Sequence, residues 1–273
     1  MPRFGPHPDR RPAVVAGASS GIGAATAVAL AGAGHPVVLG ARRLDRCEAV
    51  AAGIRDRGGE AHALWLDLTD PASVEKFASQ AEEVAGDIDV AVACAGQSLP
   101  DSAPGAFEAM VDVNMVGTYR LVTAMLPAMK ARCRGDLVFV SSEVVRHPRP
   151  GTAAYVASKW GMEGYARTLQ MQLEGTGVRA SIVQAGQAAT EMGSDWDPDA
   201  TAAILESWIH WGLARHDNFL LPDAVAAAVV TVVATPPGTH LTMVEVAPEA
   251  PIRRRQLDPD RPANPGPPSQ GAP

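Results

Sequence analysis

The sequence predicts an α/β fold built on a doubly wound, parallel sheet of about seven strands with helices on both faces. Short apolar, β-branched runs alternate along the chain with longer alanine-rich stretches typical of helices, and a glycine-rich turn follows the first run. Strands separated by helices need crossover connections, which make neighbouring strands parallel. The candidate strands are residues 13–15, 36–39, 61–66, 88–93, 136–140, 178–183 and 240–246, and helices are expected to begin near Ile22, Leu44, Pro71, Phe107, Thr152 and Pro222.

Length and composition are those of one domain with a substantial core. Of the 273 residues, 47% are hydrophobic and 19% are charged, which is ordinary for a globular domain. α/β domains of this length commonly enclose a single core, so residues 11–251 are expected to form one domain. The proline-rich ends, residues 1–10 and 252–273, lack apolar periodicity and are expected to be mobile tails.

Charge and cysteine content exclude several classes of protein. The formal net charge of −7 offers no broad basic surface, so no nucleic-acid partner is expected. The run Arg253-Arg254-Arg255 does not change this, because a short charged run in such a tail is ordinarily solvated. Three scattered cysteines, with no CxxC pair and no histidine cluster, indicate reduced thiols, a cytoplasmic location and no metal site.

No membrane partner is expected either. Two stretches lack charged side chains for long enough to raise the question, residues 12–41 and 224–244. The first is rich in small residues and the second is interrupted by Pro236-Pro237-Gly238, so both fit buried α/β segments better. No leucine-rich stretch follows the amino-terminal residues, which argues against a secretory signal.

The glycine-rich turn predicts a binding site for a dinucleotide. It follows the first strand and opens a helix, where glycines permit a tight turn and free N–H groups attract a diphosphate. Taken alone, such a cluster also fits an ordinary turn, but its place in a strand–turn–helix unit favours the nucleotide site. The residues concerned are Gly17, Ser19, Ser20, Gly21, Ile22 and Gly23.

The end of the second strand indicates which dinucleotide binds. NAD sites commonly place a carboxylate there to hold the ribose hydroxyls, but this sequence has Gly40-Ala41-Arg42-Arg43. A guanidinium suits the 2′-phosphate of NADP instead. The sequence therefore predicts NADP(H), with Arg42 as the better candidate for the phosphate contact. For Arg43, a solvated position at the start of the next helix fits equally well.

Four polar residues form the candidate catalytic set. Tyr155 and Lys159 are four residues apart and share one face if their segment is helical. Ser142 follows an apolar strand, at the edge where doubly wound sheets bind their ligands. Asn114 is a polar residue within a helical stretch. Separately, each also fits a structural role: a surface pair, a strand-end turn and a helix irregularity.

The glycine spacing Gly-x-x-x-Gly-x-Gly and the order of these four residues resemble the short-chain dehydrogenase/reductase family over residues 11–248. The resemblance implies a Rossmann-type fold and hydride transfer between NADP(H) and a carbonyl or secondary alcohol. Tyr155 would exchange the proton, while Lys159 would favour the tyrosinate and hold the nicotinamide ribose. Ser142 would bind the substrate oxygen and Asn114 would position a water. The family serine stands thirteen residues before the tyrosine, which selects Ser142 over Ser141.

The same resemblance implies further cofactor contacts. Asp67 stands where the family contacts adenine; it also fits a helix cap, although Asp70 is better placed for that role. Thr190 stands where the family reaches the nicotinamide carboxamide. The other expected contacts are Leu68, Ala95, Gly96 and Gly186. Departures from the family pattern at Ala16, Ala93-Cys94 and Ala185 bear on the cofactor affinity, and Cys94 is expected to be a small core residue.

Residues 187–221 are predicted to form a lid over the substrate. Three of the five tryptophans fall in this segment, and a helical apolar stripe that includes Trp208, Ile209 and Trp211 requires burial. Packing on the domain or on a neighbouring subunit explains the stripe equally well. As a lid it would close an apolar pocket with few charges, suited to a bulky apolar ketone. The expected pocket residues are Leu99, Val144, Met192, Trp196 and Trp208.

A homodimer or homotetramer is also expected, because the family commonly pairs the helices after its fourth and fifth strands, here about residues 107–132 and 152–174. Small residues would permit close packing there: Ala153, Ala157, Gly161 and Ala166. The alternative to an enzyme is a catalytically idle NADP-binding sensor or scaffold, against which the complete catalytic set argues. A sugar-nucleotide epimerase shares the Tyr-x-x-x-Lys pair but is disfavoured by the chain length.

Overall fold

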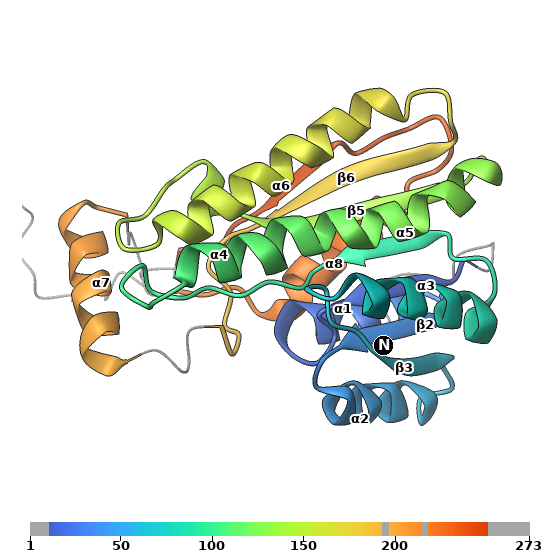
Figure 1. The fold of residues 1–273 in the computed structure, drawn as a ribbon, viewed down its shortest axis with the longest axis horizontal. Helices are drawn as coiled ribbons and strands as arrows, with labels where there is room; N and C mark the ends of the chain where they lie inside the picture. Colours follow the sequence, from blue (N-terminus) through green and yellow to red (C-terminus); the bar gives the residue numbers. More distant parts are fainter. Residues whose placement is uncertain (1–10, 193–196, 214–217, 251–273) are drawn as a thin grey trace, which may run out of the picture.

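The computed structural model describes residues 11–192, 197–213 and 218–250, which build one seven-stranded parallel sheet covered by helices (Figure 1). The strand order is β3-β2-β1-β4-β5-β6-β7, so the chain first runs outward from β1 and then runs outward from β4 on the other side. The predicted doubly wound α/β sheet is confirmed. The strands are β1 (Ala13–Ala16), β2 (Val37–Ala41), β3 (Ala61–Trp65), β4 (Val90–Ala93), β5 (Gly135–Ser142), β6 (Val178–Ala185) and β7 (Met243–Val246).

Each predicted helix start lies within one residue of an observed helix. The predicted helix over residues 107–132 is in fact interrupted by one turn of π-helix, Asp112–Val116. A short 3-10 turn, Glu143–Val145, follows β5. The helices are α1 (Gly21–Gly32), α2 (Leu44–Arg55), α3 (Pro71–Ala85), α4 (Ala106–Val111), α5 (Gly117–Ala131), α6 (Ala153–Gln172), α7 (Pro198–His210) and α8 (Pro222–Val233).

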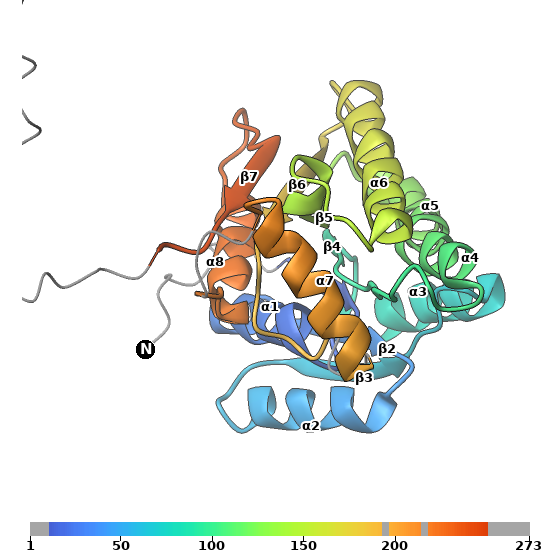
Figure 2. The same cartoon turned by 90° about the vertical axis from the view of Figure 1, so that its left-hand side faces the viewer.

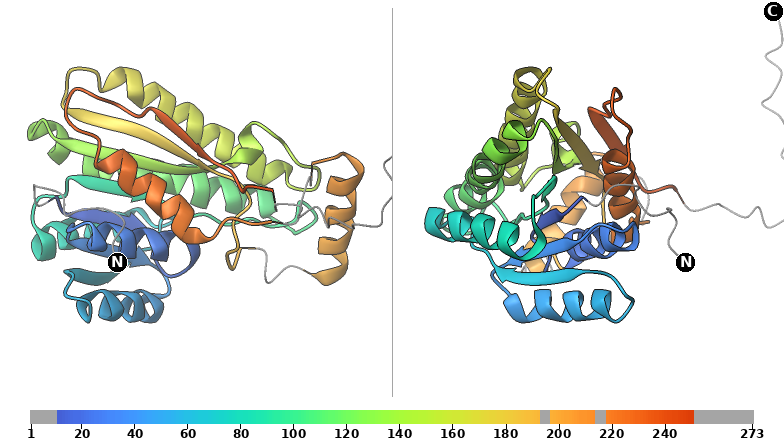
Figure 3. Two further views of the ribbon diagram at one scale, coloured as in Figure 1. Left: turned by 180° about the vertical axis from the view of Figure 1, so that it is seen from behind. Right: turned by 90° about the vertical axis from the view of Figure 1, so that its right-hand side faces the viewer.

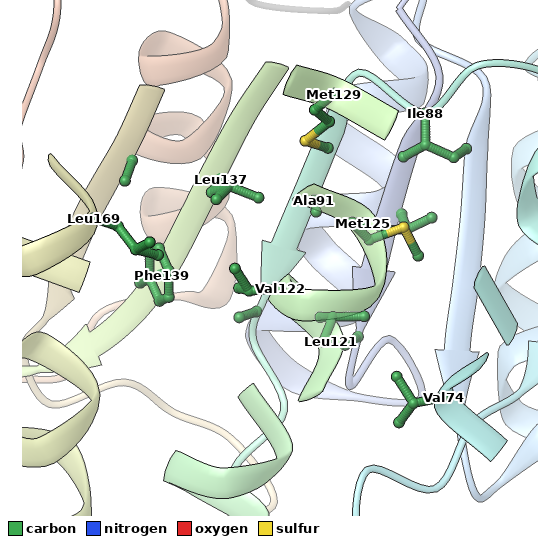
Figure 4. Close-up of a cluster of buried hydrophobic side chains, with 14 of the residues drawn as sticks. Val74, Ile88, Ala91, Leu121, Val122, Met125, Met129, Leu137, Phe139 and Leu169 are labelled. Atoms are coloured by element: carbon green, nitrogen blue, oxygen red, sulfur yellow. The ribbon is translucent and has the colours of Figure 1, made fainter. Parts of the chain in front are cut away.

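The two faces of the sheet bury separate cores, because neighbouring residues of a strand point to opposite faces. Val14 belongs to the core beneath α3, α5 and α6, with Phe77. Val15 belongs to the core beneath α1, α2 and α8, with Leu30. All four side chains are fully buried. Figure 4 shows part of the first core, and Figures 2 and 3 show the two helix layers on either side of the sheet.

The carboxyl ends of β5 and β6 extend two residues beyond the bounds that the sequence predicts. The pattern of apolar, β-branched residues ends at 140 and 183, but the strands continue to pair, Ser141 with Gln184 and Ser142 with Ala185. Hydrogen bonding to a neighbouring strand, rather than side-chain type, therefore decides where these strands end. The extension places Ser142 at the last position of β5, an interior strand of the sheet.

Within residues 187–221, the described helix α7 stands in front of the carboxyl ends of the strands (Figure 2). The two stems of this segment join, with Ala189 N donating to Leu220 O at 2.9 Å. The predicted burial of the whole apolar stripe is wrong: Ile209 and Trp211 are 68% and 66% exposed, whereas Trp208 is partly buried. Consecutive residues of a helix point in directions about 100° apart. One face of α7 therefore packs Trp208 against the domain, while Ile209 points to solvent.

The described residues contain no helix that is both long and apolar enough to cross a bilayer. The two predicted tails, residues 1–10 and 252–273, lie outside the described residues, as does Trp196 of the predicted pocket.

Candidate active site

The glycine-rich turn between β1 and α1 is tightly packed, and no side chain caps the amino-terminal end of α1. Gly17 has a φ of +85°, and a Cβ there would lie 2.6 Å from Ala95 Cα. A Cβ on Gly23 would lie 2.2 Å from Gly17 O. The side chain of Ser20, which precedes α1, makes no capping hydrogen bond. These features fit a diphosphate, because the backbone leaves room for close approach and the first N–H groups of α1 point outward.

A cavity of about 960 Å³ begins at this turn and continues along the carboxyl edge of the sheet. Every described residue of the predicted sites lines it except Asn114. The lining residues that the sequence predicted are Gly17, Ser19, Ser20, Gly21, Ile22, Gly23, Arg42, Arg43, Asp67, Leu68, Ala95, Gly96, Leu99, Ser142, Val144, Tyr155, Lys159, Gly186, Thr190, Met192 and Trp208. The topology explains this convergence, since β1, β4, β5 and β6 all end at the same edge.

Two arginines and a glutamate surround one end of the cavity. Arg43 donates to Ser20 Oγ at 2.8 Å and to Ser19 Oγ at 3.0 Å. It also pairs with Glu191 at 2.9 Å, and Arg46 pairs with the same carboxylate at 2.8 Å. The hydrogen bond from Arg43 is the main reason that the pKa of Glu191 lies below its usual value. Arg43 is therefore joined to the glycine-rich turn, which favours a site role over a purely solvated helix start.

Asp67 and Asp70 have separate positions at the end of β3. Asp67 accepts hydrogen bonds from the amide and the hydroxyl of Thr69, at 2.9 and 2.8 Å. Burial opposes its ionisation, but these bonds and the charge of Arg42 outweigh that effect and lower its pKa. Asp70 caps α3 by accepting from Ala72 N. The alternative role of Asp67 as the cap of α3 is thus filled by Asp70, and the Asp67 side chain reaches the cavity.

Lys159 and Tyr155 lie on the first turns of α6, against the end of β5. The Lys159 Nζ atom donates to Val140 O at 3.0 Å and lies 5.8 Å from the centroid of the Tyr155 ring. Burial lowers the pKa of Lys159 to about 8. Burial also raises the pKa of Tyr155 to about 12, although a hydrogen bond with Ser142 opposes the rise. These pKa values leave the Tyr155 phenol neutral and the Lys159 amine largely protonated at neutral pH.

Asn114 lies behind the cavity and joins three segments. It sits in the π-helical turn and is fully buried. Its side-chain amide exchanges two hydrogen bonds with the backbone of Gln97, at 2.8 and 2.9 Å, and donates to Ser158 Oγ at 2.9 Å. The extra residue in the π-helical turn interrupts the regular helix and aims this side chain inward. Asn114 therefore fixes the loop after β4 against α6.

The wall near Tyr155 carries a charged pair that sequence reasoning missed. The expectation of few charges in the pocket is wrong, because Arg149 and Glu143 both line the cavity and form an ion pair. Arg149 also lies under the ring of Trp208, with 4.7 Å between the guanidinium carbon and the ring centroid. Only the position of Glu143 directly after Ser142 was a signal in the sequence. Arg149 belongs to a loop without periodicity.

Cys94 is partly buried between a core and the cavity, which it helps to line. Its side chain packs against the second core, with Val92 and Val183 among the buried members. Burial raises the pKa of its thiol to about 12, so the thiol stays neutral at physiological pH and is a poor nucleophile. The prediction of a small core residue therefore holds for its packing contact, but Cys94 also faces the cavity.

Fold and site together define a class, oxidoreductases built on a doubly wound parallel sheet. The sequence model of the short chain dehydrogenase family matches residues 11–201 of this chain. The chain belongs to that family.

Relatives and solved structures support the assignment. The chain is 35% identical over 239 residues to the glycine betaine reductase ATRR of Emericella nidulans, covering 86% of this chain but only 18% of that much longer protein. It is 37% identical over 188 residues to a putative ketoacyl reductase of monensin polyketide synthase from Streptomyces virginiae, covering 67% of this chain and 72% of that one. An alcohol dehydrogenase from Thermococcus sibiricus, complexed with 5-hydroxy-NADP, is similar in structure with a TM-score of 0.74 and 29% identity, covering 87% and 96%.

Because the charge of Lys159 is buried, we predict that this residue lowers the stability of the folded protein at neutral pH. Folding lowers the pKa of Lys159 from about 10.5 to about 8. Below pH 8 the lysine is charged in both states, and its burial lowers the free energy of unfolding by the full amount. This loss of stability becomes smaller as the pH rises from about 8 to about 10.5, because the folded protein then carries the neutral amine. Lys159→Met should therefore raise the free energy of unfolding by about 1–2 kcal/mol at pH 7. The gain over the wild type should shrink toward pH 10.

Urea denaturation of the ligand-free protein at several pH values measures this difference. Lys76→Met, on the exposed side of α3, is the control and should not change the free energy of unfolding at any pH. A Lys159→Met protein that is less stable than the wild type at pH 7, or whose gain does not depend on pH, would contradict the proposed desolvation of Lys159.

Proposed function

We propose that this chain is an NADPH-dependent oxidoreductase that transfers hydride between the nicotinamide and a carbonyl or secondary alcohol. The observation that carries the proposal is one cavity that contains the glycine-rich turn at one end and Ser142, Tyr155 and Lys159 at the other. The structurally similar alcohol dehydrogenase complexed with 5-hydroxy-NADP supports the choice of nucleotide. When bound, NADPH supplies the hydride.

The residues at the turn end of the cavity would hold the nucleotide. The turn from Gly17 to Gly23 would receive the diphosphate, and Arg42, with Arg43, would hold the 2′-phosphate. Asp67 and Leu68 would contact the adenine, and Thr190 the carboxamide. The remaining contacts would come from Ala95, Gly96, Gly186 and Lys159, which line the same cavity.

In the reducing direction Tyr155 would act as the general acid. The carbonyl oxygen gains negative charge as hydride arrives at carbon, and a phenol at hydrogen-bond distance neutralises that charge by donating its proton. Ser142 would hydrogen-bond the same oxygen and hold it against Tyr155. The Lys159 ammonium stabilises the tyrosinate that results, because opposite charge favours the ionised phenol. In the oxidising direction the proton returns from the alcohol to Tyr155.

The substrate proposed from the sequence is a bulky apolar ketone, and the cavity supports its apolar part. Leu99, Val144, Met192 and Trp208 line the wall beyond the catalytic residues. Residues 187–221 would act as the lid, since their joined stems place α7 across the strand ends and Trp208 against the pocket. Residues 11–251 would form the catalytic domain.

We also propose a homodimer or homotetramer in the cytoplasm. Phe107, Tyr119 and Trp160 are 55%, 52% and 55% exposed along α4, α5 and α6, an unusual exposure for large aromatic side chains. Among the predicted contact residues Ala153 and Ala157 are exposed, but Ala166 is fully buried in the core and is wrong as a surface contact. Light scattering at micromolar concentration should give at least twice the monomer mass; a monomer would contradict the proposal.

The free cysteines Cys47, Cys94 and Cys133 support a reducing compartment.

Tyr155→Phe should lower kcat by about 10²–10⁴-fold, because the general acid is lost while the ring and its packing remain. Cofactor affinity, measured by titrating protein fluorescence with NADPH, should stay within about 3-fold of the wild type. Tyr119→Phe is the matched control, because Tyr119 lies outside the cavity and is exposed; it should keep full activity. Substantial turnover by Tyr155→Phe would overturn the role of Tyr155 as the acid.

The ratio of kcat/KM with NADPH to kcat/KM with NADH tests the arginines. Arg42→Ala should lower this ratio about 10-fold or more, since a charge-assisted hydrogen bond to the 2′-phosphate is lost. Arg43→Ala should lower it as well, given the contact of Arg43 with Ser19 and Ser20. Arg57→Ala, a change of an exposed arginine near the end of α2, should leave the ratio unchanged. A wild-type enzyme that prefers NADH, or an unchanged ratio in Arg42→Ala, would refute the assignment.

A further inference from the structure

The end of the cavity beside β2 already holds an anion from the chain itself, the carboxylate of Glu191. It pairs with Arg43 at 2.9 Å and with Arg46 at 2.8 Å, and the Arg46 Nη1 atom reaches both carboxylate oxygens. All three residues line the cavity. Their side chains are 45% exposed for Arg43, 46% for Arg46 and 51% for Glu191. The ion pairs are therefore accessible to a ligand that enters the cavity.

Each of the three nitrogen atoms of the Arg43 guanidinium group has a partner within the described chain. Nε donates to Ser19 Oγ at 3.2 Å, and Nη2 donates to the hydroxyls of Ser19 and Ser20 at 3.0 and 2.8 Å. Nη1 donates to Glu191. The serine hydroxyls are neutral, so Glu191 is the charged acceptor among these partners. A phosphate that binds the Nη1 edge of Arg43 must take the place of this carboxylate.

The backbone that carries Glu191 is held close to the site. Two residues before Glu191, Ala189 N donates to Leu220 O at 2.9 Å, and Leu220 N donates to Gln187 O at 2.8 Å. Because the carboxylate belongs to the same chain as the arginines, it competes for them at a high effective concentration. The hydrogen bond from Arg43 lowers the pKa of Glu191, so the competitor is ionised at neutral pH.

The two nicotinamide dinucleotides differ in whether they need these arginines. The 2′-phosphate of NADP(H) carries about two negative charges and several strong acceptor oxygens, so it binds a guanidinium better than a single carboxylate does. NAD(H) has no phosphate at this position and leaves the ion pairs of Glu191 intact. The carboxylate therefore opposes the binding of NADP(H) alone, and it reduces the preference that the arginines give.

We propose that Glu191 is a specificity-determining residue of the nucleotide site, because its carboxylate occupies the place of the 2′-phosphate and must leave Arg43 and Arg46 when NADP(H) binds. This inference rests on the proposed function. It adds an acidic competitor to a phosphate site for which the sequence predicted only the cations Arg42 and Arg43.

Calorimetric titrations with two adenosine phosphates test the exchange without turnover. Adenosine 2′,5′-bisphosphate carries the 2′-phosphate, whereas adenosine 5′-monophosphate lacks it. Glu191→Gln keeps the shape of the side chain and removes its charge. It should lower the Kd of the bisphosphate about 3–10-fold, since exposed ion pairs are individually weak, and change that of the monophosphate less than about 2-fold.

Asp45→Asn is the matched control, because Asp45 is an exposed acidic residue on the first turn of α2, next to Arg46 in sequence, and does not line the cavity. It should change neither Kd by more than about 2-fold. The dinucleotides give a second readout by protein fluorescence. The ratio of the Kd for NADH to the Kd for NADPH should rise about 3–10-fold in Glu191→Gln and stay unchanged in Asp45→Asn.

The double variant Arg43→Ala with Arg46→Ala separates competition from simple repulsion. In that background Glu191→Gln should change the Kd of the bisphosphate less than about 2-fold, because the arginines for which the carboxylate competes are absent. If Glu191 acted only as a negative charge near the phosphate, the gain of about 3–10-fold would remain in the double variant.

The outcomes separate this inference from the proposed function. Three results would overturn the role of Glu191 while leaving the preference for NADP(H) in place: unchanged or weaker binding of the bisphosphate in Glu191→Gln, an equal gain in Asp45→Asn, or a gain that persists without the two arginines. If the wild type bound the two adenosine phosphates equally well, the assignment of NADP(H) and this inference would fall together.

Discussion

The candidate site depends on one buried interaction, the hydrogen bond from the Lys159 ammonium group to the backbone of β5. Lys159 is 4% exposed and donates to the carbonyl of Val140, so its position is set by the packing of α6 against β5. The same packing brings Tyr155 beside Ser142, and a Cβ on Gly96 would lie only 3.5 Å from the ammonium. Taking this charge out of water opposes folding, and the lowered pKa of Lys159 is the sign of that cost. Under the proposed function this cation would have a use, because an ammonium group beside a phenol favours the tyrosinate.

Polar contacts join the segments of the site to one another. Asn114 connects the loop after β4 to α6, and Thr118 donates to the Asn114 carbonyl from the next turn. The start of α6 is held by Asp101, which accepts from the amides of Ala153 and Ala154 at 2.8 and 3.2 Å. These contacts tie α6, and with it Tyr155 and Lys159, to loops at the carboxyl edge. Preorganised geometry of this kind is what electrostatic catalysis needs.

Local patterns in the sequence were sufficient to predict the sheet and the helix starts, and together with the family resemblance they predicted part of the cavity lining. Each of those features depends on a short run of residues, such as the glycine-rich turn or the spacing of Tyr155 and Lys159. The missed features depend on neighbours that are distant in sequence. Trp208 meets Arg149 only because α7 lies over the loop after β5, and Glu191 meets Arg43 only because the residues that follow β6 pass beside the glycine-rich turn. The true ends of β5 and β6, and the exposure of Trp211, are likewise set by pairing and packing and not by residue type.

Under the proposed function, NADPH bound in the cavity around Tyr155 and Lys159 gives its hydride to a carbonyl carbon of the substrate. NADPH deuterated at both C4 positions, incubated with the wild-type protein and ethyl benzoylacetate in ordinary water, tests it directly. Mass spectrometry and NMR of the product should show one deuterium bound to the new carbinol carbon and an ordinary proton on the oxygen. Binding of the labelled NADPH without formation of deuterated alcohol, or an alcohol without deuterium at that carbon, would contradict the account.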